Sequence, residues 1–275
     1  KMRKKQSLIF ICVTSLVYIF LLLSANSEPV KFYGTFTQGG LMRGKTAFDA
    51  EVFFDNKKIN LSSDGWFVFG FGRSHPILSK LKVVFSDDTF EIYELNIKQR
   101  KWPTQRIDGL PNKMVNPPIN TLKRIKSEAE EVKISRSNFL DRDWFKDSFL
   151  WPLKGKITGV YGTKRILNGL PRQPHYGVDI AAPEGRSVVA ANSGLVRLAK
   201  LNLYYTGGTI IIDHGHGVTS TYLHLSQLSV VKGEIVKKGQ RIGLVGQTGR
   251  STGPHLDWRI NWYDKRIDPL LVVDN

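Results

Sequence analysis

The chain has 275 residues and a formal net charge of +16, with 41% hydrophobic residues and six tryptophans. This length fits one large domain or two of ordinary size, and the apolar content is sufficient for packed cores, which argues against a disordered chain. Cys12 is the single cysteine, so an intramolecular disulfide and a cysteine-based zinc site in the folded region are excluded. Any metal must therefore be held by histidine, aspartate or glutamate.

The N-terminal residues have the three parts of a secretory signal. Lys1–Lys5 is basic, Ser7–Leu23 is an almost unbroken apolar run, and Ser24–Ser27 supplies small residues for a cleavage site. The pattern predicts a signal peptide over residues 1–27. The alternative is an uncleaved membrane anchor, although the run is slightly short for a free-standing span. Both predict an exported protein of the periplasm or cell envelope, which contacts the membrane only through this segment if it is retained.

The net positive charge indicates the kind of partner that the protein binds. Without residues 1–27 the formal charge falls from +16 to +12. This charge favours anionic surroundings such as the cell-wall polymer or lipid headgroups. Nucleic acid is the competing interpretation, but the export signal and the lack of a recognisable nucleic-acid module argue against it. A solvated basic surface without a partner would have the same composition.

Residues 28–98 alternate apolar and polar residues in short runs. Turn signals at Asp55–Asn56, Asp64–Gly65 and Asp87–Asp88 separate these runs. The pattern predicts a small β-sandwich-like domain. His75 stands alone before a proline, and we expect it in a loop. With no cluster of ligands or nucleophiles, this domain is either a binding or spacer module or a packing unit.

Residues 99–150 are predicted to connect two domains. Lys98–Pro118 contains four of the twelve prolines and predicts an extended linker, which could dock on one of its neighbours. From Ile119 to Ser137 the apolar residues recur at spacings of three and four, which predicts an amphipathic helix. The apolar positions are Ile119, Leu122, Ile125, Ala129 and Val132. We expect Phe139–Phe149, which is rich in aromatic residues, to pack this arm onto the domain that follows.

Residues 151–275 return to short strand-like runs with Gly, Pro and Asn turns between them. Many short strands at this spacing predict a strongly bent antiparallel sheet or partly open barrel with loops at its ends. The expected strands are Lys156–Tyr161, Ser187–Ala191, Gly194–Ala199, Thr209–Asp213, Val218–Leu225 and Arg241–Gly246. The fold class is therefore mainly β, with a helical linker arm between two β domains.

Three segments of this last region carry histidines and carboxylates. His175 and Asp179 lie four residues apart in PHYGVDI, and His224 lies in the alternating run TSTYLHLS. In GPHLDWRINW, His255, Asp257 and Arg259 alternate with apolar residues, and a period of two places these three on one face of a strand. Imidazoles and carboxylates gathered in this way have the composition of a zinc site with a catalytic base beside it.

The ordered set His-x-x-x-Asp, TYLHLS and GPHLD resembles the lysostaphin/LytM-type zinc metallopeptidases, which cut peptide cross-links in bacterial peptidoglycan. The resemblance runs from about Trp151 to Leu271 and includes the glycine pattern of VKKGQRIGLVGQTGRSTGPH. It implies a β-sheet groove with zinc at its floor. It also implies an exported zinc metalloendopeptidase that hydrolyses peptide bonds in peptidoglycan stem peptides or cross-links.

The resemblance assigns roles residue by residue. His175 and Asp179 match the first two metal ligands of the family. His224 and His255 match its two non-ligand histidines, which orient or deprotonate water and stabilise the tetrahedral intermediate. Asp257 is a departure, because the family motif ends His-x-His and its second histidine is the third ligand. A carboxylate also ligates zinc, at about 2.0–2.2 Å. We therefore predict a His175–Asp179–Asp257 zinc site; alternatively, Asp257 is an outer partner of a ligand, or the site is metal-poor and inactive.

Other polar residues of this domain are less specific. His214 and His216 lie in DHGHG, which we interpret as a hairpin turn rather than as metal ligands. Four further side chains could bind peptide carboxylates or glycan, and these are Arg165, Asn168, Arg250 and Arg259. The sequence does not establish which of them face the groove.

Two classes of function are compatible with these observations. The first is the zinc endopeptidase acting on peptidoglycan. The second is a catalytically inactive relative that binds the cell wall or regulates another cell-wall hydrolase, which would then be its partner. A third, a general protease of soluble proteins, is weaker because nothing in the sequence indicates side-chain specificity.

Overall fold

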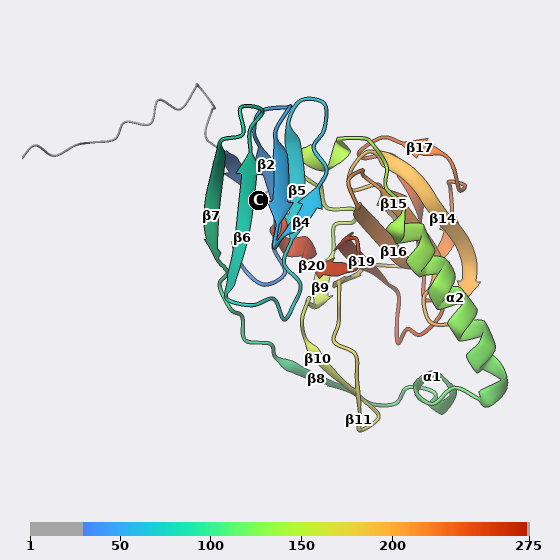
Figure 1. Ribbon diagram of the computed structural model, residues 1–275. Coiled ribbons are helices and arrows are strands. Elements are labelled where there is room, and N and C mark those ends of the chain that lie inside the picture. Colours follow the sequence, from blue (N-terminus) through green and yellow to red (C-terminus); the bar gives the residue numbers. More distant parts are fainter. Residues whose placement is uncertain (1–29, 274–275) are drawn as a thin grey trace, which may run out of the picture.

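The computed structural model describes residues 30–273, so the predicted signal segment lies outside it. An N-terminal β domain lies beside a larger, strongly bent sheet, and a long helix crosses one side of that sheet (Figure 1). Within residues 30–273, no helix combines the length and the apolar character needed to cross a membrane. The mainly β fold class is confirmed.

The N-terminal domain consists of two antiparallel sheets packed face to face. One has the order β1-β2-β5 and the other the order β4-β3-β6-β7. The strands are β1 (Lys31–Tyr33), β2 (Leu41–Lys45), β3 (Glu51–Phe54), β4 (Lys57–Ile59), β5 (Trp66–Gly70), β6 (Leu78–Val84) and β7 (Phe90–Asn96). Side chains of both sheets form one core, which contains Phe54 and Leu81 from one sheet and Phe67 and Phe69 from the other. This packing gives the domain the sandwich character that the alternating sequence predicts.

The turns of this domain follow the sequence signals. Asp55 and Asn56 have φ values of 45° and 63° and form the two-residue loop between β3 and β4. Positive φ at both positions is what a type I′ hairpin requires, and Asn and Asp tolerate it better than other non-glycine residues. Gly65 and Asp88 also have positive φ, at the two other predicted turns.

The connecting segment is more structured than a linker. It contains β8 (Thr104–Ile107), the short helix α1 (Asn112–Val115), α2 (Ile119–Ser137) and the 3-10 helix η1 (Trp144–Lys146). Part of Lys98–Pro118 is extended and docked on a neighbour, because β8 pairs in parallel with β10 (Lys164–Leu167) of the C-terminal domain. The predicted helix from Ile119 to Ser137 is confirmed by α2.

The predicted apolar face of α2 is only partly covered. Ile119 is 87% exposed and Leu122 is 46% exposed, so neither belongs to a core. Val132 packs against Leu198 and Leu203 of the large sheet. The helix therefore packs on the sheet along its C-terminal half, which also supplies most of the helix residues that line a cavity described below.

The C-terminal domain contains one ten-stranded sheet. Its main path has the order β17-β14-β15-β16-β19-β12-β9, with β13, β18 and β20 joined at its sides. Its strands are β9 (Lys156–Gly159), β12 (Val178–Ala181), β13 (Ser187–Val189), β14 (Gly194–Leu203), β15 (Gly207–Asp213), β16 (Val218–Leu228), β17 (Ile235–Val236), β18 (Arg241–Val245), β19 (His255–Trp262) and β20 (Lys265–Ile267). A hairpin of β10 and β11 (Leu170–Arg172) joins β8 in a separate small sheet, and the 3-10 helix η2 (Pro269–Leu271) follows β20. All six expected strands are present, with ends that differ by a few residues.

Strand β19 is central in this sheet and organises the core. It is paired with β16 on one side and with β12 on the other. Leu256, Trp258 and Ile260 are fully buried in the main core, as the period of two predicts. The alternate side chains, including Asp257, point to the opposite face.

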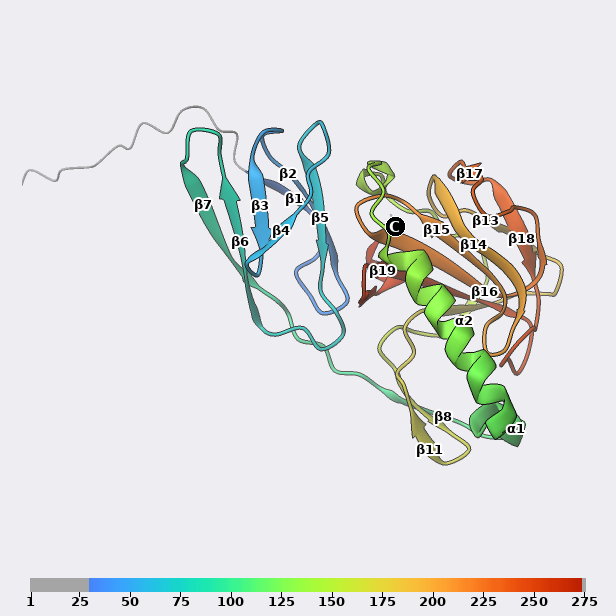
Figure 2. The same cartoon turned by 45° about the vertical axis from the view of Figure 1, so that its right-hand side comes forward.

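The two β domains pack directly on each other (Figure 2). Trp262 contacts both hydrophobic cores, and a side chain at Gly70 would collide with Ile267. Arg100, which follows the N-terminal domain, forms a 2.8 Å ion pair with the buried carboxylate of Asp268. The C-terminal domain is therefore supported by its neighbour at the ends of β19 and β20.

Candidate metal centre and active-site cavity

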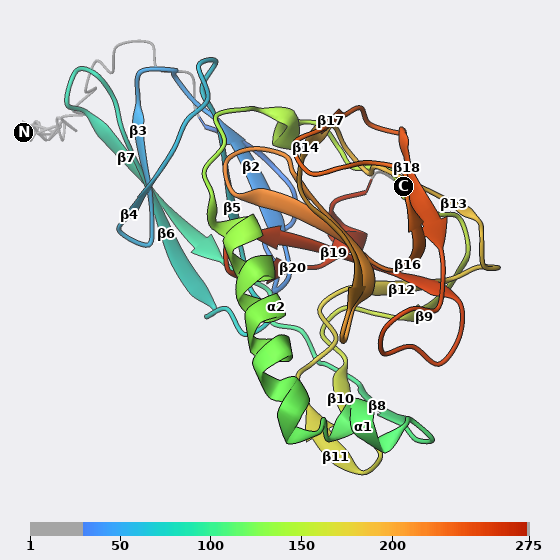
Figure 3. The same cartoon turned by 90° about the vertical axis from the view of Figure 1, so that its right-hand side faces the viewer.

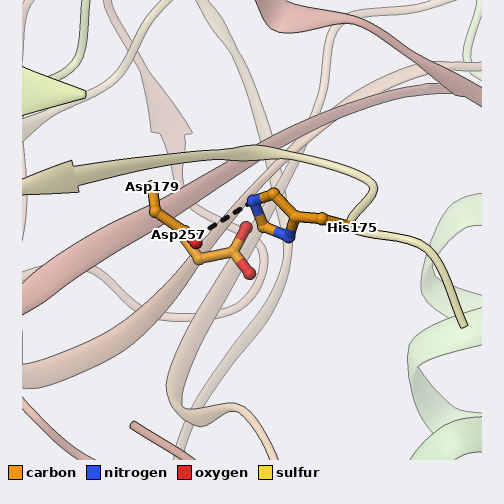
Figure 4. Close-up of side chains that lie close together, drawn as sticks. All are labelled: His175, Asp179 and Asp257. Carbon is orange, nitrogen blue, oxygen red and sulfur yellow. Dashed lines mark ion pairs between the residues drawn. The ribbon is translucent and has the colours of Figure 1, made fainter. Parts of the chain in front are cut away.

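The structure brings His175, Asp179 and Asp257 together (Figure 4). One ligand atom from each residue lies within 4.8 Å of the other two. Asp179 of β12 and Asp257 of β19 are direct cross-strand partners, and His175 lies in the loop before β12. The His175 main chain is held in place by hydrogen bonds with Gly162 and Thr163. The sheet register therefore determines the separation of the carboxylates, and the loop adds the imidazole.

The three side chains are almost completely buried. His175 Nε2 lies 3.1 Å from Asp179 Oδ1, and neither atom has a partner with good hydrogen-bond geometry among the described residues. Burial and the neighbouring Asp257 raise the pKa of Asp179, but His175 and Arg165 more than offset them, so the net pKa is lowered. Asp179 is therefore an ionised carboxylate with one oxygen available to a cation.

An arginine binds each carboxylate. Arg165 of β10 donates from Nη2 to Asp179 Oδ2 at 2.7 Å. Arg259 of β19 forms a bidentate pair with Asp257, from Nε to Oδ1 at 2.9 Å and from Nη2 to Oδ2 at 2.5 Å. Burial raises the pKa of Asp257, but the charge of Arg259, its hydrogen bonds and the neighbouring His175 and His224 together outweigh burial and hold this pKa well below its usual range. Both carboxylates are thus ionised and charge-compensated.

Two glycines make room for these carboxylates. Gly159 of β9 is the cross-strand partner of Asp179, and a Cβ at Gly159 would lie 2.3 Å from Asp179 Oδ2. A Cβ at Gly177 would lie 2.5 Å from Asp257 Oδ1 and 2.6 Å from Arg259 Cγ. These distances are far below van der Waals contact, so both acids can occupy their positions only because residues 159 and 177 are glycines.

His224 reaches the site through an irregularity in β16. Tyr222 and His224 would share a face in a regular strand, and Tyr222 is in the core. His224, however, has φ of 66°, and Leu225 instead takes the next core position. A local break of this kind re-aims a side chain and is common beside active sites. The expectation of simple alternation through TSTYLHLS is wrong at this residue.

The two non-ligand histidines lie against each other, with ring centroids 4.7 Å apart. His224 Nδ1 donates to the Thr248 carbonyl at 2.7 Å, and His255 Nδ1 donates to the Gly253 carbonyl at 2.8 Å. Because a carbonyl can only accept, Nε2 is the atom that each neutral ring has left for a proton. Burial lowers the pKa of His224 to about 4, so this imidazole is neutral near pH 7.

His224, Asp257 and the two arginines bound to the carboxylates line a cavity of about 830 Å³. The sheet forms its floor and α2 forms a wall, as the position of α2 across the sheet suggests (Figure 3). His224, Asp257 and Arg259 lie on the floor, and Ile125 and Val132 line the helix wall. The cavity is therefore a chamber in which a ligand can contact the helix and the buried cluster at once.

The other polar candidates separate into two groups. Arg165, Arg250 and Arg259 line the cavity. Asn168 does not belong to its lining, because it is in the β10–β11 turn and its side chain bonds the main chain of Leu110. The suggestion that Asn168 binds substrate is therefore not supported by its position.

His75, His214 and His216 have partners elsewhere. His75 Nε2 lies 2.7 Å from Ser79 Oγ, within the N-terminal domain. His214 bonds the Ser193 carbonyl and the Ser220 hydroxyl, while His216 packs against Phe139 and Phe145. The hairpin turn predicted for DHGHG is confirmed between β15 and β16, although both of its histidines are buried. They anchor the segment before β9 to the sheet.

Sequence reasoning missed several residues of this site. It did not pair Arg165 with Asp179 or Arg259 with Asp257, and it gave no role to Arg136 or Arg266, which also line the cavity. The alternation of β19 does place Arg259 on the same face as Asp257, so that pair had a signal. Arg136 and Arg165 reach the site only because distant segments pack together, and no local sequence pattern indicates such packing.

Comparisons with known proteins agree with this geometry. Residues 173–269 match the model of peptidase family M23. Over 108 residues the chain is 46% identical to the peptidoglycan DD-endopeptidase ShyA of Vibrio cholerae, an alignment that covers 39% of this chain and 25% of that protein. Over 99 residues it is 40% identical to the DD-carboxypeptidase/endopeptidase Mpg of Neisseria gonorrhoeae, covering 36% and 23%.

One solved structure resembles most of the chain. A Pseudomonas aeruginosa crystal structure assigned to M23 peptidases aligns with a TM-score of 0.64 and 25% identity, covering 87% of this chain and 95% of that one. The likeness therefore extends beyond the C-terminal sheet. The chain spans only about a quarter of the length of the curated relatives that it matches.

Proposed function

Because the C-terminal domain belongs to peptidase family M23, we propose that this protein is an exported zinc metalloendopeptidase that hydrolyses peptide bonds in peptidoglycan stem peptides or cross-links. The observation that carries the proposal is the buried group of His175, Asp179 and Asp257 beside two histidines whose Nε2 atoms are available. The names of the relatives support the substrate class, and the periplasm or cell envelope is where such a substrate lies.

The donor set fits a zinc ion. Zinc favours histidine and carboxylate ligands at about 2.0–2.2 Å, and a catalytic site has three protein ligands with one open position. A tetrahedral arrangement at these lengths places ligand atoms roughly 3.4 Å apart. The three residues here lie within 4.8 Å, and small movements of their side chains would reach that spacing. The metal would also satisfy His175 Nε2 and Asp179 Oδ1, two buried atoms without hydrogen-bond partners.

Arg259 reconciles an aspartate with a position where the family has a histidine. A second carboxylate adds a negative charge that would weaken the metal as a Lewis acid. The bidentate pair with Arg259 neutralises that charge and leaves Asp257 with lone pairs for a cation. We therefore propose that the Asp257–Arg259 pair takes the place of a neutral imidazole ligand.

The protein residues around the site would then divide the work. A bound zinc ion supplies Lewis acidity and lowers the pKa of water toward about 7. His224 is held neutral by burial, with Nε2 free to accept a proton from the attacking water. His255 Nε2 lies 3.9 Å from Asp179 Oδ1. Once this nitrogen carries a proton, it would donate a hydrogen bond to the carbonyl oxygen or a proton to the leaving amine. The cavity beside them would receive the peptide.

A second candidate is a catalytically inactive relative that binds the cell wall or regulates another hydrolase. One observation favours it: both oxygens of Asp257 already accept hydrogen bonds from Arg259. If this ion pair excludes the metal, the cluster is a closed structural network rather than a catalytic site. The protein would then act through a partner, a second cell-wall hydrolase that it binds or regulates.

Metal content and peptidoglycan digestion together separate the two. We would measure zinc stoichiometry and affinity for the wild type, Asp257→Ala and Asp257→His, and then the release of soluble fragments from purified peptidoglycan. One zinc per chain that is lost in Asp257→Ala, together with digestion, supports the enzyme. A wild-type site that stays empty and fills only in Asp257→His refutes the enzyme and supports the inactive relative.

A further inference from the structure

An uneven distribution of charge marks the cavity beyond the metal cluster. Five arginines line it, namely Arg136, Arg165, Arg250, Arg259 and Arg266. Two of them, Arg165 and Arg259, are paired with the carboxylates of the cluster. Arg136 and Arg266 form no ion pair with an acidic side chain in residues 30–273. The cavity therefore contains two positive charges that its own acids do not compensate.

These two guanidinium groups converge on one acceptor. Arg136 Nη1, from the C-terminal end of α2, lies 3.5 Å from Asn261 Oδ1, and Arg266 Nη1, from β20, lies 3.2 Å from the same oxygen. Asn261 belongs to β19 and is directly paired with Arg266. An amide oxygen carries no net charge, so it positions the two cations without neutralising them.

Most of their hydrogen-bonding capacity is unused. Each guanidinium has five N–H donors. Besides its contact with Asn261, Arg136 uses one of them, on Nε, to bond the Val132 carbonyl. None of the nitrogens of Arg136 or Arg266 is among the buried atoms that lack a partner, so the nitrogens without a hydrogen bond are accessible, and both residues line the cavity. Burial, followed by repulsion from Arg136, lowers the pKa of Arg266 to about 9. A bound anion would relieve this repulsion.

We propose that Arg136 and Arg266, held by Asn261, form a subsite for a carboxylate of a peptide bound along the cavity. Paired guanidinium groups with free N–H donors match the geometry of a carboxylate, which they bind by parallel hydrogen bonds. A peptide is the favoured source, because Asn261 of this subsite and Asp257 of the candidate metal centre line the same cavity and lie on the same strand.

The strand gives the spacing of the two subsites. Asp257 and Asn261 are four residues apart on β19 and point to the same face. At about 3.3 Å per residue they are separated by about 13 Å. An extended peptide has the same rise, so the recognised carboxylate lies three to four residues from the peptide bond at the cluster. The inference thus deepens the proposed function, on which it rests for the choice of peptide.

Calorimetry on the full chain tests the subsite. The probes are a peptidoglycan stem tetrapeptide with free carboxylates and the same peptide with its carboxylates amidated. Neither contains a cross-link. We expect the free form to bind about tenfold or more tightly, as charged hydrogen bonds predict. Arg136→Gln and Arg266→Gln should each remove most of this preference and leave zinc content unchanged. Arg241→Gln, an exposed arginine of β18 outside the cavity, should retain it.

Two further measurements prevent an ambiguous outcome. In the wild type the preference should shrink as salt is raised, which needs no variant and is independent of any effect on folding. Inorganic phosphate should compete only weakly. Equal affinity for both peptides, full preference in both glutamine variants, or phosphate binding as tight as the peptide would overturn the subsite. If the protein prefers the free carboxylates but leaves peptidoglycan intact, the subsite is supported and the proposed function is refuted. If it digests peptidoglycan without this preference, the proposed function is supported and the subsite is refuted.

Discussion

Gly177 is a position where one added methyl group should disturb the cluster of His175, Asp179 and Asp257. Its φ is not in the left-handed region, so alanine meets no backbone strain there. The added methyl group would lie 2.5 Å from Asp257 Oδ1, 2.6 Å from Arg259 Cγ and 2.7 Å from the Trp258 carbonyl oxygen. These contacts are about 0.7–0.9 Å shorter than the 3.4 Å at which ordinary contact begins.

The consequences can be worked out from these distances. Metal–ligand bonds tolerate deviations of about 0.2 Å, so a shift of Asp257 large enough to relieve the clash would break the zinc bond proposed for this residue. Loss of a residue that hydrogen-bonds a metal ligand reduces metal affinity about 10–100-fold. We therefore expect the zinc affinity of Gly177→Ala to fall about 100-fold or more. Overpacking should also lower the free energy of unfolding by about 1–3 kcal/mol.

Chelator competition gives the zinc affinity, and urea unfolding gives the stability. Gly253→Ala is the matched control, because a Cβ at Gly253 meets nothing within 4 Å although it lies in the loop before β19. Gly159→Ala should act like Gly177→Ala through Asp179, which its Cβ would approach to 2.3 Å. Wild-type zinc affinity in Gly177→Ala, or an equal loss in Gly253→Ala, would refute the reasoning.

Three further predictions concern charge and burial. Burial lowers the pKa of His214 to about 4, below its ordinary 6.5, so between these values the unfolded chain binds a proton at this residue and the folded chain does not. The free energy of unfolding should therefore fall by about 2 kcal/mol between pH 7 and pH 5 through this residue, and urea unfolding of His214→Gln should show a weaker dependence of stability on pH. Arg259→Met leaves the buried Asp257 unpaired and should destabilise the zinc-free protein by about 3–5 kcal/mol, with part recovered on adding zinc; an unchanged denaturation midpoint contradicts the ion pair. Asp268→Asn removes the partner of Arg100 at the domain interface and should cost about 1–3 kcal/mol in thermal unfolding, a loss absent from the exposed-site control Asp264→Asn.

The parts of the fold that depend on local sequence could be predicted. The turn at Asp55–Asn56, the bounds of α2 and the alternation of β19 all follow from backbone preference or periodicity. The same alternation is sufficient to place His255 and Asp257 on one face of the strand. These features need only residues close together in the chain.

The rest depended on contacts between distant segments. The positive φ of His224 breaks an alternation that looked regular, because the strand must put Leu225 in the core. Ile119 and Leu122 fitted the helical period but are exposed, since the helix packs against the sheet further along, at Val132. The pairing of Arg165 with Asp179 depends on how the β10–β11 hairpin packs, which periodicity does not encode.

The position of β19 between two partners limits how this domain can vary in length. Its main chain is hydrogen-bonded to β12 and β16, so the strand cannot slide independently. Deleting one residue inside it would exchange its faces, moving Trp258 toward the cavity and the charged pair of Asp257 and Arg259 into the hydrophobic core. Insertions and deletions in related sequences should therefore collect in the loop at residues 247–254, and the strand itself should keep its length even where its residues change.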